Sequence, residues 1–247
     1  MYSNSYVFRY AAIMVILVAA ALASVAMLLK PAQERNVAIE RMRNILAAAN
    51  IEATADNAID LYNKHIIEEE VISPKGDVVG IYKDQKLDKG DIRPFDINLK
   101  EELYKHTKGQ DFVLPLYIAK VNDDTLYIFP LLGRGLWGPV FGNLALKKDF
   151  NTVAGSMFGH DKETPGLGAE IQNPEFEKQF IGKKIFDEKG NFTSIKVMKG
   201  ASKIMTPGQL VHGVDAISGG TITSNGVSAM IQSNLTNYLE YIKKHKI

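Results

Sequence analysis

Hydroxyl side chains are concentrated in one short stretch near the C-terminal end of the chain, DAISGGTITS at residues 215–224. Four of the seven residues 218–224 carry a hydroxyl group, and two others are adjacent glycines. An apolar, β-branched run at 209–217 and an amphipathic run at 225–242 flank the glycines, a pattern typical of a strand, a tight turn and the start of a helix. Backbone N–H groups and the helix dipole favour an anion there. The stretch is therefore a candidate site where a hydroxyl binds a phosphate or is esterified by one.

Two familiar catalytic turns do not fit this stretch. No lysine follows the glycines, as it would in the phosphate-binding loop of nucleotide hydrolases. The G-x-S-x-G spacing of a nucleophile elbow is also missing. An ordinary helix cap explains one hydroxyl, and Thr223, Ser224 and Asn225 are all suitable caps. We assign the cap to Thr223, which leaves the other hydroxyls as candidates for phosphate chemistry.

Two more loops could hold a ligand. Trp137, the single tryptophan, lies in GRGLWGP at residues 133–139, and is either a core residue or a planar surface for an aromatic ligand. The sequence ETPGLG at 163–168 is either a structural turn or a loop that binds a heterocycle, with Glu163 accepting and the amides donating hydrogen bonds. His160 is predicted to lie in a loop and His212 in a strand without a paired acid, so neither is predicted to be a general base.

The composition excludes several kinds of chemistry. The 247-residue chain has no cysteine and five scattered histidines, which excludes thiol chemistry, iron–sulfur clusters and disulfides and argues against a histidine-built metal centre. A net charge of +1 gives no sign of a nucleic-acid partner. The acidic run at 68–70 is predicted to be the solvated end of a helix, and Asp123 with Asp124 to form a turn. No metal site is predicted.

Residues 11–29 form an uncharged apolar segment of 19 residues. As a helix it would be about 28 Å long, close to the hydrocarbon thickness of a bilayer. A retained membrane anchor fits better than a cleaved signal peptide, whose apolar core is shorter, or a buried helix of a soluble protein. Pro31 is expected to end or kink this helix. The segment contains no carboxylate, so an ion path within it is not expected.

The remaining periodicities indicate an α+β fold, in which a helical hairpin follows the anchor and a mixed β-sheet is flanked by helices. Helices are predicted at 33–50, 54–70, 98–106, 174–181 and 225–242, and strands at 71–73, 78–82, 112–121, 125–131, 140–146, 152–158, 192–198 and 209–217. Three parts follow from this: a membrane anchor at 1–31, a helical and β-hairpin extension at 32–131, and a C-terminal domain at 132–247.

The motif at Asp215 to Thr221 resembles D-x-x-S/T-G-A-T, the flavinylation motif of FMN-binding domains, and ETPGLG resembles that family's second signature. With the anchor and the overall length, the chain is similar to the C subunit of the Na+-translocating NADH:quinone reductases. In that family a separate flavin transferase, acting outside the cytoplasm, uses FAD to attach FMN to a threonine through a phosphoester. The family usually has alanine where this chain has Gly220, a difference that removes a methyl and no functional group.

The resemblance implies a set of site residues, none of them an acid–base catalyst. Thr221 would carry the FMN, and Trp137, Thr164 and Leu167 would surround its isoalloxazine ring. Lys196 would approach the ring and favour its reduced, anionic form. The other residues implied in cofactor binding are Glu163, Ser218, Gly219, Gly220, Ile222 and Thr223.

The function implied is that of a membrane-anchored flavoprotein subunit that transfers electrons within a Na+-translocating NADH:quinone reductase. It would be a single-pass protein of the bacterial inner membrane, with its C-terminal domain on the periplasmic side and the other subunits of the complex as partners. One alternative is the equivalent flavin subunit of a ferredoxin:NAD+ reductase complex. Another is an extracytoplasmic module that binds a phosphorylated ligand reversibly.

Overall fold

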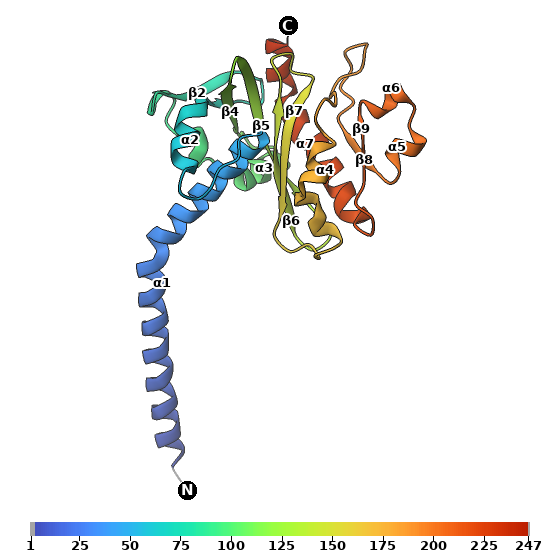
Figure 1. The fold of residues 1–247 in the computed structure, drawn as a ribbon. Helices are drawn as coiled ribbons and strands as arrows, with labels where there is room; N and C mark the ends of the chain where they lie inside the picture. The colour runs from blue at the N-terminus through green and yellow to red at the C-terminus, as the bar shows by residue number, and fades with distance from the viewer. Residues whose placement is uncertain (1–2, 247) are drawn as a thin grey trace. The chain divides into compact units, whose positions relative to one another are not determined.

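The computed structural model describes residues 3–246, and Figure 1 shows its helices and strands. The chain divides into two compact units, Met1–Arg41 and Met42–Ile247. Helices combine with a large antiparallel sheet and a small parallel one, which confirms the predicted α+β class. The two kinds of strand pairing lie in separate sheets rather than in one mixed sheet. The boundary predicted between residues 131 and 132 falls inside a strand of the large sheet.

The N-terminal helix α1 spans Asn4–Ala48 and joins the apolar segment 11–29 and most of the helix predicted at 33–50 in one continuous helix. Pro31 lies inside α1 and does not end it, contrary to one of the two outcomes expected. Proline removes one backbone hydrogen bond, but Lys30, Ala32 and Gln33 beside it are strong helix formers that keep the helical conformation. Within residues 3–246, α1 is the one helix long and apolar enough to cross a membrane.

A seven-stranded antiparallel sheet forms the centre of the unit Met42–Ile247, with the strand order β3-β2-β1-β4-β5-β6-β7 (Figure 1). Its strands are β1 (Ile66–Ile72), β2 (Val78–Lys83), β3 (Lys86–Lys89), β4 (Leu114–Val121), β5 (Asp124–Arg134), β6 (Pro139–Leu146) and β7 (Val153–His160). These confirm the predicted hairpins and the strands predicted at 140–146 and 152–158. The edge strand β3 was not predicted, because all four of its residues are exposed and three are charged.

The acidic run at 68–70 belongs to β1, and the prediction that it ends a helix is wrong. The preceding helix, α2 (Ala58–His65), stops before it. Successive strand residues point to opposite faces, so Glu69 and Glu70 enter different parts of the interior. Glu69 accepts hydrogen bonds from Arg93 and from Tyr62 of α2, whereas Glu70 accepts one from Tyr241. Paired in this way, both carboxylates are buried, which unpaired charges would not be.

The C-terminal helix α7 (Thr221–His245) packs against β5, β6 and β8. Tyr238 and Tyr241 are buried and donate hydrogen bonds to Pro115 O of β4 (2.6 Å) and to Glu70 of β1 (2.8 Å). On the other face of the sheet, Tyr62 of α2 packs edge to face on Tyr117 of β4. The two remaining elements of this part, η1 (Pro94–Asp96) and α3 (Leu99–Thr107), contact β4, and α3 confirms the helix predicted at 98–106.

The chain between β7 and α7 forms short elements: η2 (Gly168–Gln172), α4 (Pro174–Lys178), β8 (Lys196–Met198), α5 (Ala201–Ile204), α6 (Pro207–Leu210) and β9 (Gly213–Asp215). The strands predicted at 192–198 and 209–217 shrink to the parallel pair β8 and β9. The second of these predicted strands fails at its start because Thr206 and Gln209 form a capping box around Pro207, which begins α6. The helix predicted at 174–181 begins at Pro174 as expected and ends early.

Candidate functional site

The hydroxyl-rich stretch forms the turn between β9 and α7, as its sequence predicts. β9 ends at Asp215, and α7 begins at Thr221 with Gly220 as the N-cap residue. Gly219 has φ of +75°, a conformation that favours glycine. The Gly220 carbonyl accepts a hydrogen bond from Ser224 N (2.9 Å), which closes the first helical turn without a side-chain cap. Thr223 is therefore the third residue of α7, and its prediction as the cap is wrong.

Two threonines of this first turn have opposite environments. Thr221 is exposed, whereas Thr223 is 1% exposed. Ile222 between them is exposed as well. The backbone N–H groups of these three residues have no hydrogen-bond acceptor among residues 3–246, as is usual at the start of a helix. An exposed hydroxyl thus lies beside free amides at the positive end of the helix dipole.

Glu163 joins the first turn of α7 to the loop between β5 and β6. Its carboxylate is buried, with one oxygen accepting a hydrogen bond from the Thr223 hydroxyl. The other oxygen accepts one from Trp137 N (2.8 Å). Both oxygens therefore face protein donors, and the three site residues Trp137, Glu163 and Thr223 form one hydrogen-bonded cluster.

The environment of Glu163 keeps it ionised. Burial alone would raise the pKa of this carboxyl. The hydrogen bonds from Thr223 and from the amides of Trp137 and Gly138 act in the opposite direction and prevail, so its pKa lies below the ordinary value. Among the described residues Glu163 has no ion pair, so hydrogen-bond donors do most to stabilise its charge, with a smaller electrostatic contribution from His160.

Large apolar side chains are exposed around the turn. The exposed fractions are 64% for Trp137, 43% for Leu167 and 57% for Ile222. A Cβ atom on Gly220 would lie 3.1 Å from the Leu167 carbonyl oxygen, so Leu167 borders the turn directly. Exposed large apolar residues that gather near a polar anchor are typical of a surface that receives a ligand or a partner.

The other predicted site residues have different positions. The Thr164 carbonyl accepts hydrogen bonds from Leu167 N and Ala169 N, both 3.1 Å, and so shapes the second loop. Ser218 is an exposed residue of the turn itself. Lys196 is exposed at the start of β8, opposite Gly213, whereas the turn follows the other end of this strand pair. Its approach to the ligand stays a prediction.

Two residues with roles here were not predicted to act in the site. Asp215 accepts a hydrogen bond from Ser202 N (3.1 Å), which ties the turn to the start of α5. The Ser202 hydroxyl, and to a lesser extent the backbone amides of Ser202 and Ala201, lower the pKa of the Asp215 carboxyl. Gly168 lies so close to Thr223 and Glu163 that a Cβ atom there would collide with both side chains. The sequence signal for each was its place in a motif, the first residue of DAISGGT and the last of ETPGLG.

His160 and His212 both make hydrogen bonds to neighbouring protein groups. His160 ends β7, so its placement in a loop was wrong, and its Nδ1 accepts a hydrogen bond from Glu163 N (3.2 Å). His212 contacts Thr193 and the Lys184 carbonyl. No group of three or more His, Asp or Glu residues in the described part of the chain could hold a metal ion.

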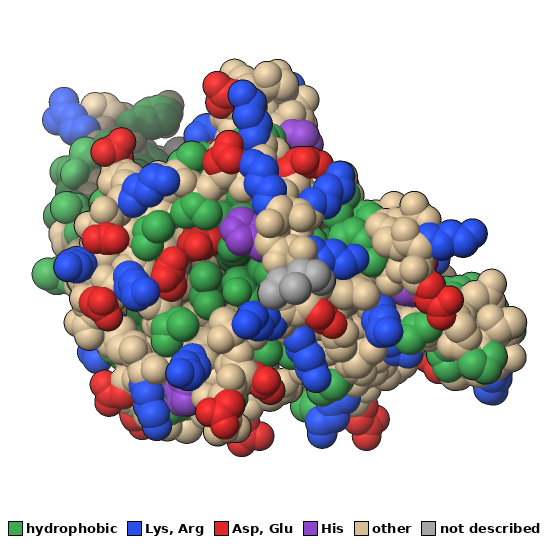
Figure 2. Space-filling model, turned by 90° about the horizontal axis from the view of Figure 1, so that it is seen from above, with side chains coloured by type: hydrophobic (Ala, Val, Ile, Leu, Met, Phe, Trp, Pro, Cys, Tyr) green, Lys and Arg blue, Asp and Glu red, His purple; other side chains and the backbone are tan. Residues whose placement is uncertain are grey.

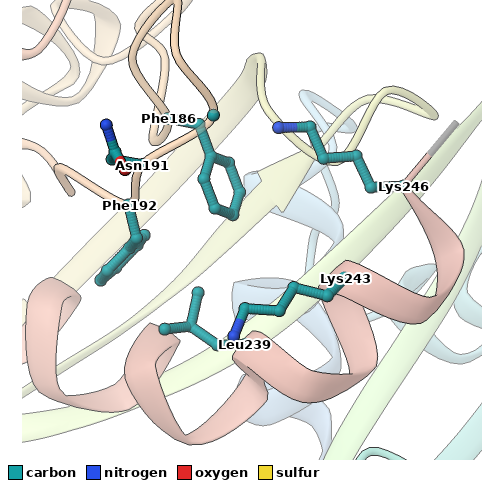
Figure 3. A pocket seen from close by; sticks show the side chains of 7 residues that line it. Phe186, Asn191, Phe192, Leu239, Lys243 and Lys246 are labelled. Carbon is teal, nitrogen blue, oxygen red and sulfur yellow. The ribbon is translucent and has the colours of Figure 1, made fainter.

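An open cavity of about 580 Å³ lies near the other end of α7. Figure 3 shows Phe186 and Phe192 on one side of it and Leu239, Lys243 and Lys246 on the other. The Lys246 ammonium lies 3.9 Å from the centre of the Phe186 ring. Acidic and basic side chains are interspersed on the face seen in Figure 2, and they form no broad patch of one sign there. This cavity contains none of the predicted site residues.

The donors and surfaces at the start of α7 fit a phosphate ester that carries a planar aromatic group. The hydroxyl of Thr221 is accessible, free amides adjoin it, and exposed apolar side chains border it. Residues 135–236 match the family model of the FMN-binding domain, which contains all of these residues. The fold and the site thus define a protein with an FMN-binding domain.

Relatives along most of the chain identify the family more closely. The C subunit of the Na(+)-translocating NADH-quinone reductase of Vibrio vulnificus is 32% identical over 204 residues, covering 81% of this chain and 78% of the relative. The corresponding C subunit of Haemophilus ducreyi is 34% identical over 214 residues, covering 83% and 79%. The crystal structure of the C subunit from Parabacteroides distasonis superposes with a TM-score of 0.74 at 34% identity, covering 87% of this chain and 96% of that one. The chain belongs to the family of the C subunits of the Na(+)-translocating NADH-quinone reductases.

Proposed function

We propose that this chain carries FMN on Thr221 through a phosphoester bond and transfers electrons within a Na+-translocating NADH-quinone reductase. The observation that carries the proposal is the exposed hydroxyl of Thr221 at the first residue of α7, next to the exposed apolar side chains of Leu167 and Ile222. The match to the FMN-binding domain supports the cofactor class, and the first turn of α7 would be the attachment point.

The first turn of α7 favours Thr221 over Thr223 as the acceptor. The Thr223 hydroxyl is buried and donates a hydrogen bond to Glu163, so it is not accessible to an enzyme acting from solvent. The Thr221 oxygen would form a bond to the FMN phosphorus of FAD while the pyrophosphate bond breaks, AMP leaves and the hydroxyl proton is released. The resulting diester keeps one negative charge, which the free amides and the dipole of α7 stabilise.

The chain's side chains would hold the isoalloxazine ring rather than react with it. Bound FMN supplies the electron-transfer chemistry, and the protein sets its position and surroundings. Trp137 offers a planar face, while Leu167 and Ile222 offer apolar contacts beside the attachment point. Thr164, Ser218, Gly219 and Gly220 shape the adjoining loops, and Lys196, if it reaches the ring, would favour its reduced, anionic form.

We further propose that α1 anchors the chain in the bacterial inner membrane, with the C-terminal unit on the periplasmic side. The length and apolar composition of α1 support the anchor. Attachment of flavin by a transferase that acts outside the cytoplasm requires Thr221 on that side. The FMN-binding part would then begin near residue 132, and residues 32–131 would extend its sheet with β1 to β4. The other subunits of the reductase would be its electron donor and acceptor.

A denaturing gel tests the proposal. The full chain is produced together with a flavin transferase, and the gel is viewed under ultraviolet light before staining. We expect a fluorescent band for the unsubstituted chain and for Thr221→Ser, which keeps a hydroxyl, and none for Thr221→Ala. A fluorescent Thr221→Ala band would disprove the attachment site. Flavin that leaves the unsubstituted chain on denaturation would instead indicate a module that binds its ligand reversibly.

A further inference from the structure

The Glu163 carboxylate accepts hydrogen bonds from two protein segments that are far apart in sequence. Trp137 N is 26 residues away and the Thr223 hydroxyl is 60 residues away, and each bonds a different oxygen. Glu163 is 4% exposed, so its oxygens face the interior and not the surface on which a flavin would lie. This geometry differs from that expected of a residue that binds the flavin directly.

Two glycines leave room for this carboxylate. A Cβ atom on Gly135 would lie 2.5 Å from one Glu163 oxygen. A Cβ atom on Gly168 would collide with the other oxygen and with the Thr223 hydroxyl. Two separate loops therefore approach the same side chain more closely than any other residue type allows. The packing around Glu163 is consistent with a fixed position for its carboxylate.

We propose that Glu163 is a positioning residue that holds the Trp137 loop against the first turn of α7. It also keeps the Thr223 hydroxyl hydrogen-bonded, so that this hydroxyl does not compete with Thr221 for the flavin. The proposal rests on the proposed function, because it concerns the site where the flavin is attached. Fixing the two segments before the flavin arrives lowers the cost of ordering them during attachment and docking of the ring. Thr223 acts as the tether on α7, and Thr221 remains the single free threonine hydroxyl of that turn.

The amide of glutamine can replace most of this geometry, whereas leucine cannot. The carbonyl oxygen of Glu163→Gln can accept from Trp137 N, and its NH2 group can donate to Thr223, whose hydroxyl both donates and accepts. Glu163→Leu keeps the volume but leaves the Trp137 amide and the Thr223 hydroxyl without partners. Thr223→Val keeps the side-chain shape and removes the tether, which also leaves one buried oxygen of Glu163 without its donor.

The test compares these variants in the full chain by two measurements. The first uses the chain without flavin, where Trp137 is the single tryptophan and its fluorescence anisotropy reports directly on its loop. The second is the initial rate at which flavin is attached by the transferase from FAD, well below each variant's melting temperature. The matched control is Glu175→Leu, because Glu175 is an exposed glutamate of α4 that has no hydrogen bond or ion pair among the described residues.

We expect Glu163→Leu and Thr223→Val to lower the anisotropy of Trp137 and to slow flavin attachment about tenfold. Glu163→Gln is expected to regain most of both losses, and Glu175→Leu to resemble the unsubstituted chain. Unchanged anisotropy and rate in Glu163→Leu and Thr223→Val would overturn the positioning role, even if Thr221 still carries flavin. If no variant or parent chain takes up flavin, the proposed function fails, and the anisotropy still decides whether Glu163 fixes the loop.

Discussion

At its N-terminal end, α7 presents Thr221 and Ile222 to solvent, whereas Leu235, Tyr238 and Ile242 near its other end are fully buried. The first turn keeps free amides and one free hydroxyl. In the later turns the buried Tyr238 and Tyr241 bond to the sheet, Tyr238 to Pro115 O and Tyr241 to Glu70. The C-terminal part of α7 is thus held by the core, whereas its first turn is exposed to solvent.

This difference shows how the chain places an exposed hydroxyl at the end of a helix that the core holds in place. Buried apolar side chains of α7 belong to the core and hold the helix axis. The first turn, which lacks such burial, is instead held by Glu163 through Thr223. Substitutions in the two regions should therefore separate stability from flavin attachment.

The largest expected effect on stability comes from Leu235→Ala in the buried region. Removing this fully buried side chain should lower the free energy of unfolding by about 3 kcal/mol, through lost burial and the cavity left behind. Urea denaturation measures the loss, and flavin attachment to the folded fraction should remain. Thr221 is exposed, so an equal loss of stability in Thr221→Ala would contradict the difference between the two ends of α7.

Gly168→Ala should disturb the hydrogen bond between Glu163 and Thr223 that holds the first turn of α7. Its Cβ atom would collide with Thr223 and Glu163, so we expect about 1–3 kcal/mol lower stability and slower flavin attachment. Gly208→Ala is the matched control, because nothing lies within 4 Å of a Cβ atom there. Thermal unfolding and a flavin-attachment assay measure the two effects. If both alanine variants behave alike, the crowding at Gly168 has no consequence.

A pH-dependent effect is expected at Glu177 in α4. Burial raises the pKa of this carboxyl to about 7, although the amide of Phe158 donates a hydrogen bond to it (2.7 Å). A raised pKa means that the folded state favours the protonated form, so its contribution to stability is complete below the ordinary pKa of 4.5 and is lost as pH rises through 7.

Glu177→Gln keeps the acceptor for Phe158 and removes the charge. We expect it to raise the free energy of unfolding by about 1 kcal/mol at pH 8, and to have no effect near pH 4.5. Urea denaturation at both pH values measures this. A difference from the parent chain that does not change with pH would show that the buried charge is not its cause.

The smallest effect is expected from Gly220→Ala, which introduces the alanine usual in the family motif. The methyl group would lie 3.1 Å from Ile217 Cγ2 and from the Leu167 carbonyl oxygen, a tight but accessible fit at φ of −105°. We expect less than about 1 kcal/mol change in stability and the same flavin occupancy by mass. Loss of attachment would mean that the turn of this chain depends on glycine at its N-cap.

The buried face of α7 could be predicted from the sequence, because its apolar residues follow the helical period. The six predicted core residues are all buried: Val227, Met230, Ile231, Leu235, Tyr238 and Ile242. The start of the helix was placed too late, because Gly220 and Thr221 do not belong to that periodic pattern. The strand β3 was missed for the same reason, since it has no buried face.

The hydrogen bonds of the buried carboxylates could not be predicted, because the two partners are far apart in sequence and belong to common residue types. Nothing local pairs Glu163 with Thr223, 60 residues on, or Glu70 with Tyr241, 171 residues on. A charge run is usually solvated, and Glu69 and Glu70 depart from that rule only because donors such as Arg93 and Tyr241 meet them in the fold. Residue types and spacing single out the hydroxyl-rich stretch, Trp137 and ETPGLG, and the family resemblance adds their assignment to FMN. The partners of Glu163 follow only from the structure.

Peptide mapping by mass spectrometry tests the central claim most directly. The full chain is produced with a flavin transferase, digested, and the peptide that contains residues 215–224 is fragmented. We predict an added mass of one FMN less one water, with the fragments that contain Thr221 carrying it and those that contain only Thr223 and later residues lacking it. FMN on Thr223, on another residue, or on no peptide would contradict the account.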